Sequence, residues 1–183
     1  LEPARSMMIE LLNSGKDIVT ANKALLAEHG PELFDLARRT GRSIAFEAAV
    51  AGGIPIVAAI AECLAANRIE SIRGILNGTS NFILSRMEED GADYAQVLKL
   101  AQEKGYAEAD PSMDVDGTDA TQKLAILAHL AFGTWVPWAE IPRTGIEHLD
   151  ADLIACAHEL GHRIRLVAVA SRTADGRLAM RVA

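Results

Sequence analysis

An aspartate and a lysine one helical turn apart form the most informative pair in this sequence. A helix is predicted over residues 118–132, and at about 100° per residue Ile126 and Leu130 mark its apolar stripe. Asp119 and Lys123 fall on that same stripe. An exposed ion pair at this spacing contributes only about 0.3–0.5 kcal/mol and belongs on the opposite face. A lysine carried toward a core is costly unless it is paired, so Lys123 is a candidate proton donor or acceptor.

Acidic side chains crowd the segment before this helix. Between positions 108 and 119 the carboxylates are Glu108, Asp110, Asp114, Asp116 and Asp119. Their spacing is not that of an EF-hand, because the glycine and the closing glutamate are out of place. A solvated acidic loop is the simpler interpretation. Beside a lysine in an apolar stripe, these carboxylates could instead bind a cationic group such as a substrate ammonium.

Two turns between strands and helices are further candidates for ligand contacts. Lys23 follows the predicted strand 17–20 at a helix start, where its charge opposes the helix dipole. Ligands of open α/β sheets gather beyond the carboxyl ends of strands, so Lys23 is either a ligand contact or a surface lysine. Asn77-Gly78-Thr79 leads from a strand into a helix, where free N–H groups could receive an anion. An ordinary capped turn explains this motif equally well.

A glycine turn follows Glu47. The segment Glu47–Ile54 places one carboxylate near Gly52-Gly53, where exposed carbonyl groups could help to hold a hard cation. Glycines required for tight packing or a positive φ are the simpler explanation. The five histidines show no metal-ligand spacing, and neither a GxGxxG nor a Walker A loop occurs in the chain.

Strands and helices must alternate to position these residues. Helices are predicted at 3–13, from about 23 to a break at Gly30-Pro31, from there to about 41, and at 82–89, 94–104, 118–132 and 151–160. Strands are predicted at 17–20, 43–50, 68–76 and 163–170, followed by a hairpin turn at 173–176 and a last strand. This order indicates an α/β or α+β fold with a mixed sheet and helices packed on it. Residues 54–64 are apolar on every face and predict a helix buried in the middle of the domain.

Composition narrows the class of protein. The 183 residues can hold one core, or one core with an appendage. A net charge of −7 argues against nucleic acid as the main partner. No apolar stretch approaches the ~20 residues of a membrane span, so we expect a soluble protein. Cys63 and Cys156 are predicted to be buried free thiols in a reducing compartment. Because the chain starts at Leu1 without a methionine, we expect a fragment of a longer protein.

Several segments together resemble the homoserine dehydrogenase family. They are Asp17–Lys23, Phe46–Pro55, Gly74–Leu84 and, above all, Gly105-Tyr106-Ala107-Glu108-Ala109-Asp110-Pro111 continued to Lys123. The resemblance covers essentially the whole chain. It implies NAD- or NADP-dependent, reversible reduction of L-aspartate 4-semialdehyde to L-homoserine, on the route to threonine, methionine and isoleucine. It also implies a cytoplasmic homodimer. Residues 1–45 would be the C-terminal part of a Rossmann nucleotide-binding domain, and 46–183 the catalytic and dimerisation domain.

The resemblance also implies roles for individual residues. Lys123 would relay the proton to the substrate oxygen, and Lys23 would face both substrate and nicotinamide. The residues around the substrate would be Thr79, Tyr106, Glu108, Asp114 and Asp119. Gly105 would contact the cofactor through its backbone. A monovalent cation, Na⁺ or K⁺, would be bound by the Glu47 carboxylate and the carbonyls of Val50, Gly52 and Ile54.

One departure from the family pattern bears on activity. Family members begin with a Rossmann βαβ unit that carries the glycine fingerprint, and this sequence does not contain one. We therefore expect the chain alone to bind dinucleotide poorly and to turn over slowly or not at all. Three alternatives remain open from the residues: an amino-acid-binding or assembly module, an oxidoreductase of another small aldehyde or hydroxy acid, and a structural dimerisation piece.

Overall fold

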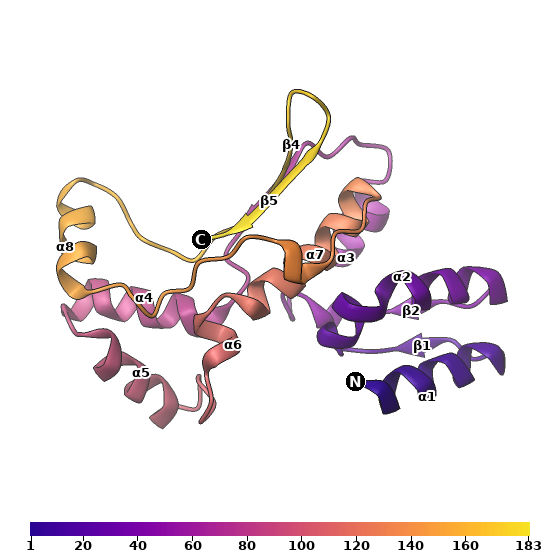
Figure 1. The fold of residues 1–183 in the computed structure, drawn as a ribbon, viewed down its shortest axis with the longest axis horizontal. Coiled ribbons are helices and arrows are strands. Elements are labelled where there is room, and N and C mark those ends of the chain that lie inside the picture. The colour runs from indigo at the N-terminus through magenta and orange to yellow at the C-terminus, as the bar shows by residue number, and fades with distance from the viewer. The chain divides into compact units, whose positions relative to one another are not determined.

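The computed structural model describes all of residues 1–183, and the chain divides into two compact units (Figure 1). The first unit consists of Leu1–Glu70 and Gln122–Glu140, and the second of Ser71–Thr121 and Ile141–Ala183. Helix α7 (Thr118–Phe132) begins in the second unit and continues into the first. No helix has the length and apolar character needed to cross a membrane.

The first unit contains a two-stranded parallel sheet with helices beside it. Strand β1 pairs with β2 so that Ile18 lies opposite Ile44. Besides part of α7, the elements of this unit are α1 (Glu2–Asn13), β1 (Ile18–Val19), α2 (Lys23–Thr40), β2 (Ile44–Ala45), the 3₁₀ turns η1 (Glu47–Ala49) and η3 (Trp138–Glu140), α3 (Ile56–Ala58) and the π-helical turn η2 (Ala59–Cys63). A β-strand, a crossover helix and a parallel β-strand in this order form a βαβ unit, which is the building block of nucleotide-binding sheets.

Helices α1 and α2 pack together around an aliphatic core. The core consists of Met8, Leu12, Ile18, Leu25, Leu33 and Ala37. Fully burying a leucine side chain contributes about 1.5–3 kcal/mol, so this cluster holds the helices on the small sheet. Val19, on the opposite side of β1, is 88% exposed.

Helix α2 corrects the prediction of a break at Gly30-Pro31. It runs unbroken from Lys23 to Thr40 with Pro31 inside it. A proline in a helix interior removes a hydrogen bond and costs about 3 kcal/mol. Leu25 and Leu33, on either side of the proline, are both buried in the same core, and their burial offsets that cost. The helix ends at Gly41, whose φ of 66° is the left-handed conformation that favours glycine at this position.

The apolar segment 54–64 is not the centrally buried helix that the sequence predicts. It forms three α-helical residues and then the π-helical turn, with Val57 and Ile60 buried. Ala61 to Leu64 are exposed. Ile54 and Leu64, at the two ends of the segment, are 61% and 42% exposed, so its apolar composition overstated its burial. Cys63 and Cys156 are likewise both exposed free thiols, which corrects the prediction of buried ones.

The second unit contains a three-stranded antiparallel sheet in the order β3-β4-β5. These strands are β3 (Ser71–Gly74), β4 (Ala168–Arg172) and β5 (Leu178–Val182). The predicted hairpin is confirmed: Gly176, with a φ of 81°, turns β4 into β5, and the Thr173 hydroxyl donates a hydrogen bond to Asp175. The fold class with both parallel and antiparallel pairing is also confirmed, although the two pairings lie in separate sheets.

Four helices complete the second unit together with the first turn of α7. They are α4 (Gly78–Asp90), α5 (Tyr94–Glu103), α6 (Ser112–Val115) and α8 (Ala151–Glu159). Helix α4 packs against both α5 and α8. Ile83, Leu84 and Met87 form its buried face. Helix α6 is a single turn and lies within the acidic segment that the sequence predicts to be a loop.

Candidate active site

Asn77 lies at the centre of a buried polar cluster in the second unit. It is the N-cap of α4, just after β3, and its Oδ1 accepts a hydrogen bond from the backbone N–H of Ser80 at 2.7 Å. Its Nδ2 donates to Asp114 Oδ1 at 2.7 Å and to Asp119 Oδ2 at 2.9 Å. One carboxamide therefore joins α4, α6 and α7.

This cluster withdraws carboxylates from water. Asn77 and Asp119 are each only 4% exposed, and Asp114 is half-buried. Buried charges are costly unless they are hydrogen-bonded or paired, and an amide supplies bonds without cancelling charge. The amide of Asn77 therefore stabilises two acidic side chains through hydrogen bonds that do not themselves neutralise either one.

The segment 105–110 is attached to α4 beside this cluster. Thr79 Oγ1 donates a hydrogen bond to the backbone carbonyl of Tyr106 at 2.7 Å, and the Tyr106 and Phe82 rings meet edge-on at 4.9 Å. Tyr106 itself is 58% exposed. Gly105, at the preceding position, has a φ of 73°, a backbone conformation that side chains rarely adopt.

Two further acidic residues of the segment differ in their surroundings. The Glu108 side chain is exposed, and its backbone carbonyl accepts from Gln102 Nε2 at 3.2 Å. The backbone is thus held while the carboxylate is free to meet a ligand. The hydroxyl and the backbone N–H of Ser112 lower the pKa of Asp110, so Asp110 supports the local turn as an anion.

Helix α7 matches its predicted bounds and presents Asp119 and Lys123 on one face. Lys123 is half-buried, while Ile126 and Leu127, on the same stripe, are buried. The predicted placement of a lysine toward apolar surroundings is therefore confirmed. The i,i+4 spacing sets the Lys123 ammonium one turn from the carboxylate of Asp119.

Lys23 is the first residue of α2, directly beyond the carboxyl end of β1. The N-cap residue is Asn22, whose side chain accepts from the backbone N–H of Leu25 at 3.0 Å, and the Thr20 hydroxyl accepts from the N–H of Asn22. Lys23 is half-buried. Because dinucleotides bind beyond the carboxyl ends of parallel strands, the position of Lys23 fits a group that contacts a bound dinucleotide.

The glycine turn after Glu47 brings only part of the predicted cation site together. Glu47 Oε1 and Oε2 accept from the backbone N–H groups of Val57 and Ala58 at 2.9 and 3.0 Å, so this carboxylate caps α3. Glu47 and Ile54 line one open hollow of about 310 Å³. No cluster of three acidic, histidine or cysteine side chains that could hold a metal occurs in the chain. A cation here would depend on backbone carbonyls in addition to Glu47, whose oxygens retain unused lone pairs.

The structure thus brings most predicted substrate residues to one place. Asp114 and Asp119 are hydrogen-bonded to Asn77 at the start of α4, and Thr79, two residues further on, is hydrogen-bonded to Tyr106. Lys23 and the Glu47 turn belong to the first unit. Sequence reasoning missed Asn77 as the residue that connects Asp114 and Asp119. The available signal was the choice of residue: serine or aspartate would cap α4 equally well, yet position 77 holds an asparagine.

Comparison with known proteins places these features in a family. The family model described as homoserine dehydrogenase matches residues 55–183, and the model of the homoserine dehydrogenase NAD-binding domain matches residues 1–47. A curated homoserine dehydrogenase of Neisseria gonorrhoeae is 53% identical over 94% of this chain. The chain spans about 40% of the length of that relative.

Solved structures agree with these matches. A homoserine dehydrogenase from Thiobacillus denitrificans, 49% identical, superposes with a TM-score of 0.96 over 100% of this chain and 42% of its own. A hyperthermophilic archaeal homoserine dehydrogenase in complex with NADPH, 31% identical, gives a TM-score of 0.82 over 100% of this chain and 53% of its own. Since one family model covers most of the chain and the other covers its N-terminal βαβ unit, the chain belongs to the homoserine dehydrogenase family.

Proposed function

We propose that the natural protein containing this chain interconverts L-homoserine and L-aspartate 4-semialdehyde with NAD or NADP. The observation that carries this proposal is the pair of carboxylates, Asp114 and Asp119, held on one buried amide beside Thr79. Carboxylates are suitable partners for an ammonium, and both proposed substrates carry an α-ammonium group. Family membership supplies the reaction class.

The carboxylates of Asp114, Asp119 and Glu108 bind the substrate ammonium in this proposal. The Thr79 hydroxyl already donates its proton to the Tyr106 carbonyl, so its oxygen is left to act as an acceptor toward the ligand. The substrate carboxylate would lie at the first turn of α4, where backbone N–H groups and the helix dipole favour an anion. Binding of the ammonium group and of the carboxylate group together fixes the position of the substrate's side chain.

Lys123 exchanges the proton at the reacting oxygen. In the reducing direction it donates a proton to the carbonyl oxygen as the aldehyde carbon gains a hydride, which makes the alcohol; in the oxidising direction it accepts the hydroxyl proton. A bound nicotinamide dinucleotide supplies or accepts the hydride. Asp119, one turn earlier, limits how far the lysine can move, and Lys23 and the Gly105 backbone contact the cofactor.

Finer features of the family belong to the same proposal. A monovalent cation, Na⁺ or K⁺, is bound by the Glu47 carboxylate with the carbonyls of Val50, Gly52 and Ile54. The protein acts as a cytoplasmic homodimer in the biosynthesis of threonine, methionine and isoleucine. The boundary between a nucleotide-binding part, residues 1–45, and a catalytic part, residues 46–183, stays a prediction.

Homoserine oxidation by the natural full-length protein tests the proposal. We expect NAD- or NADP-dependent turnover in the wild type, and a fall in kcat of about 1,000-fold or more with little change in KM in Lys123→Ala. Lys99→Ala, an exposed lysine of α5, is the control and should retain wild-type kinetics. A wild type without turnover, or an active Lys123→Ala variant, would move the assignment to an amino-acid-binding module.

A further inference from the structure

A short strap of chain, residues 142–146, connects strand β5 to the junction between α6 and α7, residues 115–117. On one side, the N–H of Thr144 donates a hydrogen bond to the carbonyl of the last residue of β5 at 2.9 Å. On the other side, the N–H of Ile146 donates to the carbonyl of the last residue of α6 at 2.8 Å. Ile146 is 1% exposed and anchors the strap. The junction therefore rests on a segment that is itself tied to the sheet of the second unit.

Gly145, within the strap, lies closer to the junction than any side chain would allow. A Cβ at this position would lie 2.7 Å from the Cα of Asp116 and would overlap the carbonyl oxygen of Val115. Both atoms belong to the backbone, so neither can rotate away as the end of a flexible side chain can. Carbon atoms in ordinary contact lie about 3.5–4.0 Å apart, so the strap and the junction would have to separate by roughly 1 Å. The glycine is what allows the strap to touch the junction.

The junction that the strap supports lies between two of the proposed substrate residues. Asp114 precedes it in α6, and Asp119 follows it in the first turn of α7. Asp116, within the junction, accepts a hydrogen bond from the N–H of Thr118 at 2.7 Å and another from its hydroxyl at 2.9 Å. These bonds tie the junction to the start of α7. A displacement of Asp116 is therefore passed on to α7 and changes the separation of the two carboxylates.

We propose that Gly145 is a positioning residue that sets the separation of the Asp114 and Asp119 carboxylates for the substrate ammonium. This inference rests on the proposed function, in which both carboxylates bind that group. With a side chain at position 145, either the junction or the strap must move, and the bond from Ile146 to the junction lengthens in both cases. Lys23, which contacts the cofactor in the proposed function, belongs to the other unit. A defect confined to the homoserine site is thus the signature of this role.

Two variants test the role, and two further substitutions in the same unit are their controls. Gly145→Ala adds the overlapping Cβ, and Ile146→Val shortens the buried anchor of the strap without adding an atom. Gly74→Ala makes the first exchange where the new Cβ would lie 3.7 Å from the Leu76 side chain, which is an ordinary contact. Ile154→Ala truncates a side chain of α8 that is 3% exposed, so it lowers stability at a position outside both strap and junction.

The measurement is homoserine oxidation by the full-length protein, with homoserine and the dinucleotide varied in turn. In Gly145→Ala we expect KM for homoserine to rise about tenfold or more, while KM for the dinucleotide stays within about twofold of wild type, because a shift near 1 Å misplaces only the amino-acid site. In Ile146→Val the homoserine KM should rise about threefold, because the smaller anchor leaves the strap looser. Gly74→Ala and Ile154→Ala should keep both KM values. A merely structural role would reduce the amount of active enzyme, which lowers the maximal rate and leaves KM unchanged.

The outcomes separate this inference from the proposed function. A wild type that does not oxidise homoserine refutes the function, and the positioning role with it. With an active wild type, a folded Gly145→Ala variant that keeps the wild-type KM for homoserine, or that raises both KM values equally, overturns the positioning role alone. If Gly145→Ala does not fold, Ile146→Val decides: an unchanged homoserine KM overturns the role. A selective rise in the homoserine KM of each folded test variant, and of neither control, supports it.

Discussion

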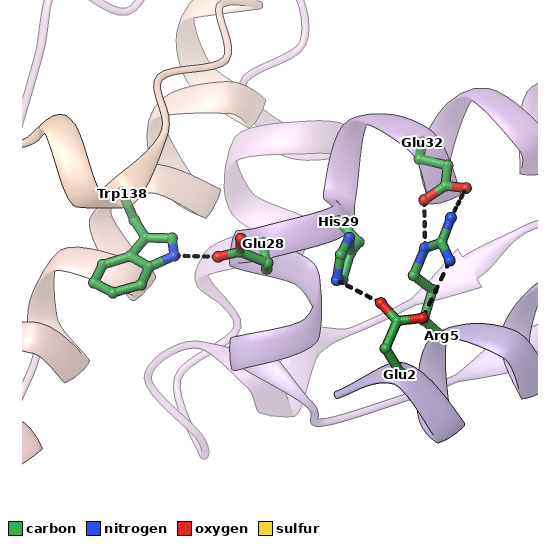
Figure 2. A network of polar contacts seen from close by, with 6 residues as sticks. All are labelled: Glu2, Arg5, Glu28, His29, Glu32 and Trp138. Carbon is green, nitrogen blue, oxygen red and sulfur yellow. Dashed lines mark hydrogen bonds and ion pairs between the residues drawn. The ribbon is translucent and has the colours of Figure 1, made fainter.

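The cluster around Asn77 and the network around Arg5 use similar polar groups in opposite surroundings. Arg5 binds both oxygens of Glu32, at 2.6 and 2.8 Å, and Glu2 lies between Arg5 and His29 (Figure 2). These side chains join α1 to α2 at the surface, where water competes for each bond and exposed pairs contribute little. The Asn77 cluster is largely withdrawn from water, since Asn77 and Asp119 are each 4% exposed, and its central donor is a neutral amide.

The difference bears on the two roles: in the proposed function the Asn77 cluster lies at the substrate, whereas the Arg5 network joins two helices. In the Arg5 network every charge has an opposite partner, and hydrogen bonding to Arg5 lowers the pKa of Glu32. Such a network is complete without a ligand. In the Asn77 cluster, by contrast, the shared donor of the two carboxylates is a neutral amide, which bonds to both without changing their charge.

The largest effect should come from removing one charge of the buried cluster. Asp119→Asn keeps an acceptor for the Asn77 amide but removes an anion that faces the ammonium. We expect kcat/KM for homoserine to fall about 100-fold, the range for a lost charge-assisted interaction, with little change in thermal midpoint. Glu32→Gln, in the exposed network, should leave kcat/KM unchanged. Equal losses of kcat/KM in the two variants would show that the Asn77 cluster matters no more to the reaction than the Arg5 network does.

A second effect concerns stability and pH in the second unit. The Glu88 side chain is 8% exposed and contacts Arg165 at 2.7 Å, His158 and Arg163. The bond to Arg165, first of all, lowers the pKa of Glu88 below its ordinary 4.5. A carboxyl whose pKa is depressed by folding contributes stability above its unfolded-state pKa and loses it as the pH falls through the folded value. Glu88→Gln should therefore lower the urea midpoint at pH 7.

The pH series gives this second prediction its control. The gap between wild type and Glu88→Gln should close as the pH is lowered from 6 toward 3. Glu89→Gln, at an exposed residue that pairs with Arg86 at 3.4 Å, should show almost no gap at any pH. A gap that stays constant down to pH 3 would show that Glu88 acts through packing and not through its charge.

A smaller effect is expected from a half-buried histidine in the first unit, His129. The His129 ring stacks on Phe34 at 5.8 Å and meets Trp135 at 5.3 Å, and its buried Nδ1 has no hydrogen-bond partner. Burial, and then the charge of Arg38, lower the pKa of His129 below 6.5. A histidine kept neutral by folding contributes stability above its unfolded-state pKa that is lost as the pH falls.

His129→Phe tests this histidine directly. The variant should lose less stability than wild type between pH 7.5 and pH 5, as measured by thermal midpoint, because phenylalanine keeps the ring contacts without a site for the proton. His148→Phe, at an exposed histidine, serves as the comparison and should keep the wild-type slope. Identical slopes in wild type and His129→Phe would exclude a neutral buried imidazole.

The smallest effect should come from the exposed network itself. Arg5→Gln removes the pairing with Glu32, yet both groups can regain water, so we expect a shift in thermal midpoint close to the error of the measurement. The shift should be larger at low salt, where surface charges are less screened. A large, salt-independent loss would show that the Arg5 network is as important to the first unit as a buried cluster.

Local chemistry in the sequence was sufficient for part of this structure. The helix Thr118–Phe132, the side of it that carries Asp119 and Lys123, and the hairpin turn at 173–176 all match their predictions. Each depends on a repeat of 3.6 residues or on turn residues such as Asp175 and Gly176, and neighbours along the chain specify both. The family resemblance, carried by motifs of the same local kind, was confirmed by comparison.

Tertiary structure decided the features that depend on distant residues. Pro31 stays inside α2 because a shared core holds both halves of that helix, and the exposure of Cys63 follows from how little of segment 54–64 is buried. Asn77 reaches carboxylates that are 37 and 42 positions away in the sequence. The sequence by itself determined the candidate side chains, and their roles stay a prediction. Only packing could decide that one amide holds two of them together, because burial and hydrogen-bond geometry arise between segments and have no periodic signal along the chain.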